Sequence, residues 1–315
     1  MTATKAAAGI ATRGPSPRGF RGQQRVFLLS VLGPMALIFL VFWIYPMLSG
    51  LWGSFTRWQA FAADREFIGL QNYQALFADP VFIRSVVNTM VYAAIYVSGS
   101  IILALTIALA IEGSGRPKTL FRFIYFLPVV TSVIATGLIW AFLYQPSVGL
   151  FNQILEVVGL PTQRFLLSPD QALVSVVVYS LWKNVGFQMV LFMAGLNNID
   201  RSFLEAAKVD GAGRWAAFRH VTLPLLRPTM VFVTLTGIIE AFQVFGPIFV
   251  MTANEANSAP GGPLDSTMVT SVYQWEVAFR ELNLGYASAM GIALFLIMLV
   301  ILLLQAPMLR SRWEY

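Results

Sequence analysis

The sequence contains no cysteine, only one histidine and few charged side chains. Without cysteine the chain has no disulfide, zinc-thiolate site or cysteine nucleophile, and His220 alone cannot form a histidine-pair metal site. Only 11% of the 315 residues are charged, against about 25% in soluble domains. Because 57% are apolar, a water-soluble fold could not cover its surface with polar groups. The composition therefore excludes soluble enzymes and indicates a membrane protein.

Nucleotide-binding motifs are missing as well. No G-x-x-x-x-G-K-[ST] loop occurs, and the glycine-rich run 113–118 has the wrong spacing for one. Gly211 and Gly213 lack the third glycine and the preceding strand of a dinucleotide fingerprint. Ser180 and Lys183 match S-x-x-K without its companion motifs. We therefore expect a protein that is not an enzyme and that hydrolyses no ATP itself.

Apolar runs of about 20 residues, the length that crosses the hydrocarbon core, predict six transmembrane segments. Four are free of charge, and two carry a single charged residue, Lys183 or Glu240. Because lipid offers no hydrogen bonds to the backbone, each segment is expected to be a helix. The predicted spans are residues 26–56, 86–111, 123–145, 171–194, 229–251 and 284–306.

Lysine and arginine predict the orientation. An even number of spans puts both termini on one side, and with the N-terminus inside, the inner segments hold 15 basic residues and the outer segments 5. Since basic residues are retained in the cytoplasm, both termini are expected there, with the protein in the cytoplasmic (inner) membrane. The first apolar run is too long for a signal-peptide core, which favours an uncleaved helix. The expected domains are a basic disordered cytoplasmic tail at 1–25, a six-helix domain at 26–306 and a cytoplasmic C-terminal tail at 307–315.

The outer loop after the first span carries apolar residues at helical spacing. Leu70, Tyr73, Leu76 and Phe77 recur every three or four residues. We expect an amphipathic helix on the outer membrane surface, which either packs within the loop or docks a partner.

The loop between the fourth and fifth spans predicts two short helices with a glycine joint. Ser202 followed by Glu205 fits a capping box at the start of the first helix. Gly211 and Gly213 permit the positive φ that ends it. A second helix over 214–221 follows, and the loop is expected to form a compact, partly apolar knob in the cytoplasm.

At this loop the sequence resembles a known family. The string Glu205-Ala206-Ala207-x-x-Asp210-Gly211-Ala212, followed by Phe218 and Leu223-Pro224, is similar to the EAA loop of binding-protein-dependent ABC permeases of the maltose-type sugar permease family. Further landmarks of that family spread the resemblance over residues 26 to 306; they are Tyr45-Pro46, Gly69-Leu-Gln-Asn-Tyr73, Asn88-Thr89, Leu127-Pro128, Ala194-Gly-Leu196, Gly261-Gly-Pro263 and Gly285-Tyr-Ala-Ser-Ala289.

The resemblance implies an all-α membrane protein with the six-helix bundle of a type I ABC importer permease. It implies four kinds of partner: a second permease, two ATPase subunits, an extracytoplasmic solute-binding protein and a sugar substrate. This chain would bind no cofactor, whereas the ATPases would bind ATP and Mg. The EAA loop, at 197–227, would place a coupling helix against an ATPase, and its contact residues by position are Glu205, Ala206, Ala207, Asp210 and Gly211.

Polar residues in the fourth and fifth spans are the candidates for a solute pathway. Ionised groups inside a membrane helix cost about 2.5–3.5 kcal/mol and face the protein interior or water. Asn184 and Gln188 share one helix face, as do Glu240 and Gln243. The candidates are Lys183, Asn184, Gln188, Glu240 and Gln243, with the aromatic residues Tyr179, Trp182 and Phe242 nearby and a weaker polar patch at Thr131, Ser132 and Thr136. Alternatively, Lys183 and Glu240 pair with each other or with the partner permease and fix helix packing.

The leading hypothesis is ATP-driven import of a di- or oligosaccharide, with a neutral sugar favoured because Lys183 and Glu240 would cancel each other's charge. Glycerol phosphate or another polyol derivative is the alternative cargo. A stand-alone channel or facilitator is a second class, although it would not need the cytoplasmic knob. A membrane-embedded transferase or protease is disfavoured by the single histidine and the single acid within the spans.

Overall fold

The computed structural model describes residues 17–62, 64–113, 118–253 and 260–309, and nearly all of its elements are helices. The chain divides into two compact units, residues 1–52 and 53–315. In the first unit α1 (Pro17–Phe39) continues through a π-helical turn, η1 (Leu40–Ile44), into α2 (Tyr45–Gly53). Since Pro46 has no amide to donate within a regular helix, a wide turn just before it accommodates the ring. The predicted span at 26–56 agrees with the apolar stretch Phe27–Gly53.

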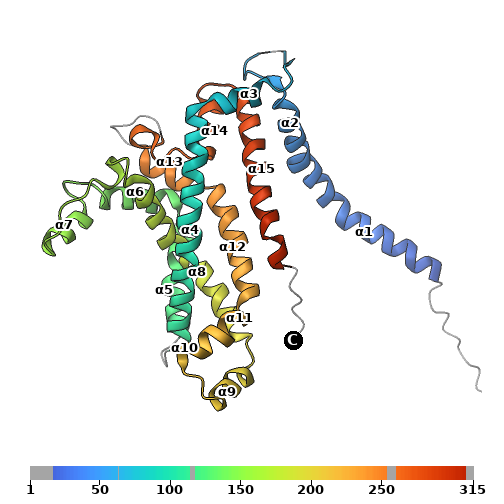
Figure 1. Cartoon of the computed structure of the whole chain (residues 1–315). Helices are drawn as coiled ribbons and strands as arrows, with labels where there is room; N and C mark the ends of the chain where they lie inside the picture. The colour runs from blue at the N-terminus through green and yellow to red at the C-terminus, as the bar shows by residue number, and fades with distance from the viewer. Residues whose placement is uncertain (1–16, 63, 114–117, 254–259, 310–315) are drawn as a thin grey trace, which may run out of the picture. The chain divides into compact units, whose positions relative to one another are not determined.

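The second unit contains a small hairpin and all remaining helices (Figure 1). Strands β1 (Thr56–Arg57) and β2 (Glu66–Phe67) pair antiparallel. The helices of the first half are α3 (Gln71–Ala78), α4 (Pro80–Glu112), α5 (Lys118–Val130), α6 (Val133–Leu143), α7 (Leu150–Val157), η2 (Phe165–Leu167) and α8 (Ala172–Asn197). Those of the second half are α9 (Arg201–Val209), α10 (Arg214–Ala217), η3 (Phe218–Thr222), α11 (Leu223–Leu225), α12 (Arg227–Phe242), α13 (Gly246–Thr252), η4 (Pro263–Asp265), α14 (Thr270–Phe279) and α15 (Leu284–Leu309).

Four helical segments in the described residues are long and apolar enough to cross a membrane, or up to six if two bent helix pairs each count as one. The 33 residues of α4 extend about 50 Å, well beyond the roughly 30 Å of a hydrocarbon core. The predicted third span is not one straight helix, because α5 and α6 meet at 94° around Thr131 and Ser132. The second bent pair joins residues 214–225 to α12 at 64°. The predicted fifth span is interrupted at a different place, since α12 ends at Phe242 and α13 begins at Gly246.

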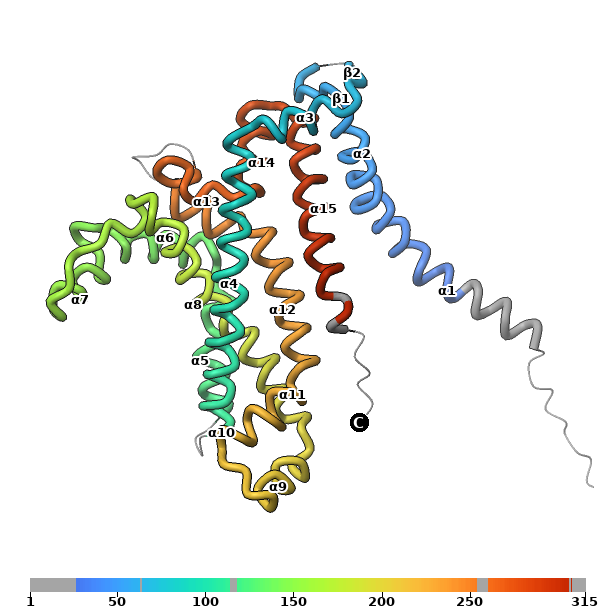
Figure 2. The backbone as a smooth tube through the Cα atoms, viewed as in Figure 1, coloured from blue at the N-terminus to red at the C-terminus, as the bar shows by residue number. Residues whose placement is uncertain are grey.

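The core of the second unit is built around α8, which packs against α4, α5 and α12 (Figure 2). Val176, Tyr179 and Met189 of α8 are fully buried. Small residues allow close approach of the helices: Ala104 and Ala108, one turn apart on α4, are likewise fully buried. A scaffold of α4, α8 and α12 therefore holds the polar residues that α8 and α12 carry.

The two ends of this unit carry the loops that the sequence predicts for opposite sides. Helices α9, α10 and α11 lie at the end where α4 finishes and α5 begins, whereas α3, α14 and the hairpin lie at the other end (Figure 1). We refer to these as the inner and the outer end. The predicted tails extend outside the described residues at 1–16 and 310–315, and the helices reach Pro17 and Leu309.

Two residues of the family landmarks, Asn72 and Gly285, make close contacts at the outer end. Asn72 Nδ2 donates to the carbonyl oxygens of Ser54, at 2.9 Å, and Thr56, at 3.0 Å. Gly285 lies so close to the hairpin that a Cβ would meet the Thr56 carbonyl oxygen at 2.3 Å. These contacts tie β1 to α3 and α15.

The predicted amphipathic helix is present as α3, but only part of its expected apolar face packs inward. Leu76 is buried and Tyr73 is half-buried, whereas Leu70 and Phe77 are exposed. The buried face instead includes Asn72.

Asp79 joins three helices at the outer end. Its Oδ1 accepts hydrogen bonds from the amides of Val81, at 2.8 Å, and Phe82, at 3.2 Å, and so caps α4. Its Oδ2 accepts from the hydroxyls of Tyr273 on α14 and Tyr286 on α15, both at 2.7 Å. Burial of the carboxyl raises its pKa, but these hydrogen bonds outweigh burial and hold the pKa of Asp79 below its ordinary value of 3.8.

We expect Asp79→Asn to lower the apparent melting temperature of the purified protein by a few degrees, equivalent to about 1 kcal/mol. Asparagine can still cap α4 through its oxygen, but it offers the tyrosine hydroxyls no carboxylate. Tyr286→Phe, which removes one of the two bonds, is expected to cause a smaller decrease. Thermal unfolding followed by circular dichroism measures both.

Wild type and Asp79→Asn also test how the contribution of Asp79 to stability depends on pH. Because the pKa of Asp79 is lower in the folded state, its contribution is complete above the unfolded pKa of 3.8 and is lost as the pH falls through the folded pKa. The difference between wild type and Asp79→Asn is therefore expected to be constant above about pH 5 and to shrink below about pH 4. A difference that persists undiminished at the most acidic pH would contradict this assignment.

Candidate functional site

A cavity of about 760 Å³ opens between α4, α8, the start of α6 and the break after α12. Its walls are mainly apolar, with a small set of convergent polar side chains, a pattern typical of solute sites. Both interruptions contribute to the lining. Val133 and Ile134, just after the bend between α5 and α6, line one side, and the segment 243–247, between α12 and α13, lines another. The polar or hydroxyl-bearing lining residues are Tyr92, Tyr96, Ser180, Lys183, Asn184, Glu240 and Gln243.

Glu240 is the acidic group of this cavity. The Tyr96 hydroxyl donates to its Oε2 at 2.8 Å, and Asn184 Nδ2 donates to the Tyr96 oxygen at 3.1 Å. The chain of hydrogen bonds thus joins α8, α4 and α12. Glu240 is exposed, and its Oε1 has no partner among the described residues. One carboxylate oxygen therefore stays available to a solute.

Lys183 lies in the cavity wall but directs its charge elsewhere. Its Nζ donates to the carbonyl oxygens of Pro128, at 2.9 Å, and Thr131, at 2.8 Å, and the residue is only 5% exposed. Within the part of the chain that the structure describes, no ion pair joins it to Glu240. Direct pairing of these two residues, one of the alternatives that the sequence left open, is therefore not found.

The other predicted residues divide between the cavity and the core. Gln243 lines the cavity at the end of α12. Gln188 does not: it is 1% exposed, faces Gly237 of α12, and its Oε1 has no partner among the described groups. The expected shared face of Asn184 and Gln188 therefore reaches the cavity only at Asn184.

None of the predicted aromatic residues lines the cavity. Phe242 is buried in the core, the Trp182 ring lies 5.2 Å from that of Trp140, and the Tyr179 hydroxyl lies 2.8 Å from Thr136 Oγ1. The lining aromatic residues are instead Tyr92, Tyr96, Phe245 and Phe249. For the two tyrosines, the i, i+4 spacing in the second span was the available signal. In an apolar run, that spacing does not distinguish cavity lining from core.

The polar patch at Thr131, Ser132 and Thr136 serves the break between α5 and α6. Thr131 Oγ1 donates to the Pro128 carbonyl oxygen at 2.6 Å, and the Ser132 hydroxyl caps α6. These groups satisfy backbone atoms that the bend frees.

The predicted coupling loop folds as two short helices, but its cap differs from the prediction. Asp200, not Ser202, precedes α9, and Asp200 Oδ1 accepts from the Ser202 amide at 2.9 Å. The pKa of Asp200 is lowered chiefly by the hydrogen bond from the Ser202 amide, and to a smaller extent by one from the Ser202 side chain. The capping box with Glu205 is therefore wrong. Asp200 directly precedes α9, after a short turn at 198–199 that follows the end of α8.

The first loop helix ends on a left-handed glycine, as the sequence predicts. Gly211 has φ +80°, and the amide of Ala212 donates to the Ala207 carbonyl oxygen at 2.9 Å. Gly213 has an ordinary φ of −68°, so the expectation of a positive φ there is wrong. Trp215 and Phe218 pack together with ring centroids 5.5 Å apart.

The loop presents a mixed surface. Glu205, Ala206, Asp210 and Gly211 are exposed, whereas Ala207 is buried. Three apolar side chains are also exposed; they are Phe203, Val209 and Trp215.

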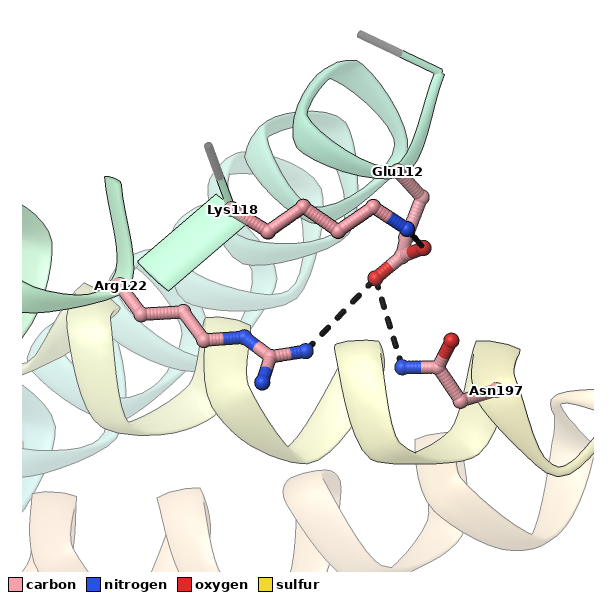
Figure 3. Close-up of polar contacts among 4 residues, drawn as sticks. All are labelled: Glu112, Lys118, Arg122 and Asn197. Carbon is pink, nitrogen blue, oxygen red and sulfur yellow. Dashed lines mark hydrogen bonds and ion pairs between the residues drawn. The ribbon is translucent and has the colours of Figure 1, made fainter. Parts of the chain in front are cut away.

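An ion cluster closes the inner end of the bundle beside this loop. Glu112, at the end of α4, is in contact with Lys118 and Arg122 of α5 and with Asn197 of α8 (Figure 3). Glu112 Oε1 lies 3.8 Å from an Arg122 guanidinium nitrogen and 3.4 Å from Asn197 Nδ2. A groove of about 850 Å³ separates the cluster from α9 and α10. The cluster therefore fastens α4, α5 and α8 to one another where they face the coupling loop across the groove.

With this geometry the chain matches known transport proteins. The family described as "Binding-protein-dependent transport system inner membrane component" matches residues 100–312. A probable ABC transporter permease of Bacillus subtilis, YurN, is 34% identical over 89% of this chain and 94% of its own. The diacetylchitobiose uptake system permease NgcF of Streptomyces coelicolor is 33% identical over 95% of this chain and 89% of its own.

A solved structure gives the fold. A bacterial ABC transporter that imports the acidic polysaccharide alginate contains a chain similar to this one, with a TM-score of 0.79 and 24% identity over 94% of this chain and all of that chain. The fold is therefore that of a type I importer permease. Since the family match covers more than half of the sequence, the chain belongs to the inner membrane components of binding-protein-dependent transport systems, and it is an ABC importer permease subunit rather than an enzyme.

Proposed function

We propose that this chain forms one half of the translocation pathway of an ATP-driven importer for a neutral di- or oligosaccharide. The observation that carries the proposal is the polar cavity bounded by the bend between α5 and α6 and by the break between α12 and α13. Irregular backbone inside a membrane is tolerated where it lines a cavity. The likeness to a diacetylchitobiose permease supports a carbohydrate as cargo.

The charges of the cavity favour a neutral solute. Glu240 offers a free carboxylate oxygen, whereas the ammonium of Lys183 is occupied by two carbonyl groups. A phosphate or uronate would meet the negative charge without a free cation to balance it. Glycerol phosphate is therefore the less favoured cargo.

Membership of the family supports the rest of the proposed assembly. A second permease would complete the pathway, an extracytoplasmic binding protein would deliver the sugar, and two ATPase subunits would hold ATP and Mg. The protein would lie in the cytoplasmic membrane with both termini and the α9–α10 loop inside. Reconstitution tests this: liposomes with the complete importer, ATP and binding protein should accumulate the sugar, whereas liposomes with this chain alone should not. Accumulation by the chain alone would favour a self-sufficient transporter.

Asn184→Ala and Glu240→Gln are expected to lower sugar uptake about tenfold each, because each removes a polar contact worth roughly 1–2 kcal/mol. ATPase activity without solute should stay unchanged. Thr106→Val is the matched control, since the exposed Thr106 hydroxyl bonds only to its own helix. Normal uptake in both cavity variants, and in the corresponding Gln243→Ala, would contradict the pathway.

Gly211→Pro is expected to leave membrane insertion intact and to abolish transport. Proline fixes φ near −65°, whereas Gly211 has φ +80° and donates its amide to the Lys208 carbonyl oxygen. Asp210→Arg, which reverses an exposed charge on the coupling surface, should act in the same direction. Gly213→Ala is the control, because Gly213 has an ordinary φ and open space around its Cβ position.

Cross-linking tests which surface of this chain contacts the ATPase. A photoreactive residue at Val209, which is 87% exposed, should capture an ATPase subunit in the assembled importer. One at Gln163, in the loop between α7 and η2 that is proposed to lie outside, should not. Ala207 is buried and is a poorer position. Capture of an ATPase subunit at Gln163 in place of Val209 would show that the chain lies in the membrane in the opposite orientation.

A further inference from the structure

The break between α5 and α6 leaves carbonyl groups that need donors. The two helices meet at 94° within the apolar run that the sequence presents as one span. The last carbonyls of a helix have no partner within it, and lipid supplies none. Thr131 meets part of this need, since its amide and its hydroxyl donate to the Pro128 carbonyl oxygen at 3.3 and 2.6 Å.

Lys183 of α8 supplies a further donor, and it comes from another helix. Its ammonium lies 2.9 Å from the Pro128 carbonyl oxygen and 2.8 Å from that of Thr131. A positive charge at a helix C-terminus also complements the partial negative charge there. The aliphatic stem remains in the wall of the cavity while the charge is used on the backbone.

Two more residues of the same α8 face contact the bent segment. The Tyr179 hydroxyl lies within hydrogen-bond distance of the Val133 carbonyl oxygen, at 3.2 Å, and of Thr136 Oγ1, at 2.8 Å. A Cβ on Gly186 would lie 1.9 Å from the Tyr125 carbonyl oxygen, so the two backbones touch there. Positions 179, 183 and 186 follow the i, i+4, i+7 spacing of one helix face, which therefore holds α5, the break and the start of α6.

The held segment is a wall of the solute cavity, and α8 leads on to the coupling loop. Val133 and Ile134 line the cavity. The stretch of α8 from Lys183 to Asn197 is about 21 Å long. Asn197 contacts the ion cluster at the inner end, and α9 begins at Arg201.

We infer that Lys183 is a positioning residue: it fixes the broken α5–α6 segment to α8, so that this wall of the cavity moves as one body with α8 when the coupling loop moves. Lys183 does not bind solute. The inference rests on the proposed function for its role in transport, whereas the attachment itself can be measured without solute.

The test uses a single cysteine in a chain that otherwise has none. Ile134→Cys places a thiol on the held wall, where the side chain is 62% exposed. The assembled importer, in membranes without solute, is treated with a small charged methanethiosulfonate, and the labelling rate of this chain is measured. With Lys183→Met added, the rate is expected to rise about tenfold, and with Lys183→Arg, which keeps the charge and the donors, it should return to within about twofold. Sugar uptake should fall and recover in parallel.

Tyr179→Phe keeps the test decisive if Lys183→Met does not reach the membrane. It removes one hydroxyl from the same face and should raise the labelling rate about threefold. Tyr144→Phe is the matched control, because its hydroxyl also bonds to an α8 carbonyl, that of Ser175 at 3.1 Å, but away from the break. It should leave the rate unchanged.

An unchanged labelling rate in Lys183→Met and Tyr179→Phe would overturn the inference. If uptake were lost at the same time, Lys183 would act on the solute directly. If the unaltered importer transported no sugar, the proposed function would fail, yet the labelling rates would still decide whether Lys183 holds the wall.

Discussion

The structure depends on one constraint, that every backbone polar group inside a bilayer must find a partner within the protein. The long helices α4, α8 and α15 meet it through their own hydrogen bonds. The two interrupted segments cannot, and each receives a donor from another helix. Lys183 reaches the break after α5, and the Ser271 hydroxyl donates to the Val244 carbonyl oxygen in the break after α12. Both breaks border the cavity, so the irregular backbone lies at the cavity that we propose for the solute.

Much of the fold could be predicted from the apolar runs, because their length fixes where helices can cross a membrane. The breaks could not. Thr131, Ser132 and the segment 243–245 lie within runs whose hydropathy stays high, and Pro128 indicates only that a helix is weakened. Whether a weakened helix bends slightly or turns through 94° depends on a partner such as Lys183, which is about fifty residues away in sequence. The cap of α9 was missed for a simpler reason, since Asp200 and Ser202 are residue types that cap helices equally well, and the sequence alone does not decide between them.

The candidate site was predicted where polarity stands out against an apolar background. Asn184, Glu240 and Gln243 are such residues, and all three line the cavity. Tyr92 and Tyr96 were not identified, because a tyrosine in an apolar run is indistinguishable from core. Helical spacing gives the face of a residue but not the depth or rotation of that face against its neighbours. For this reason Gln188, on the predicted face of Asn184, is buried against α12, and Lys183 reaches a backbone instead of Glu240.

The two ends of the bundle are fastened by different chemistry. At the outer end, Asp79 is held by short hydrogen bonds from neutral tyrosine hydroxyls and amides. At the inner end, Glu112 faces Lys118 and Arg122, whose side chains are 41% and 43% exposed. Dissolved ions weaken exposed ion pairs but act little on neutral donors. Raising the ionic strength therefore weakens the fastening at the inner end before that at Asp79, and the inner end is the one next to the coupling loop.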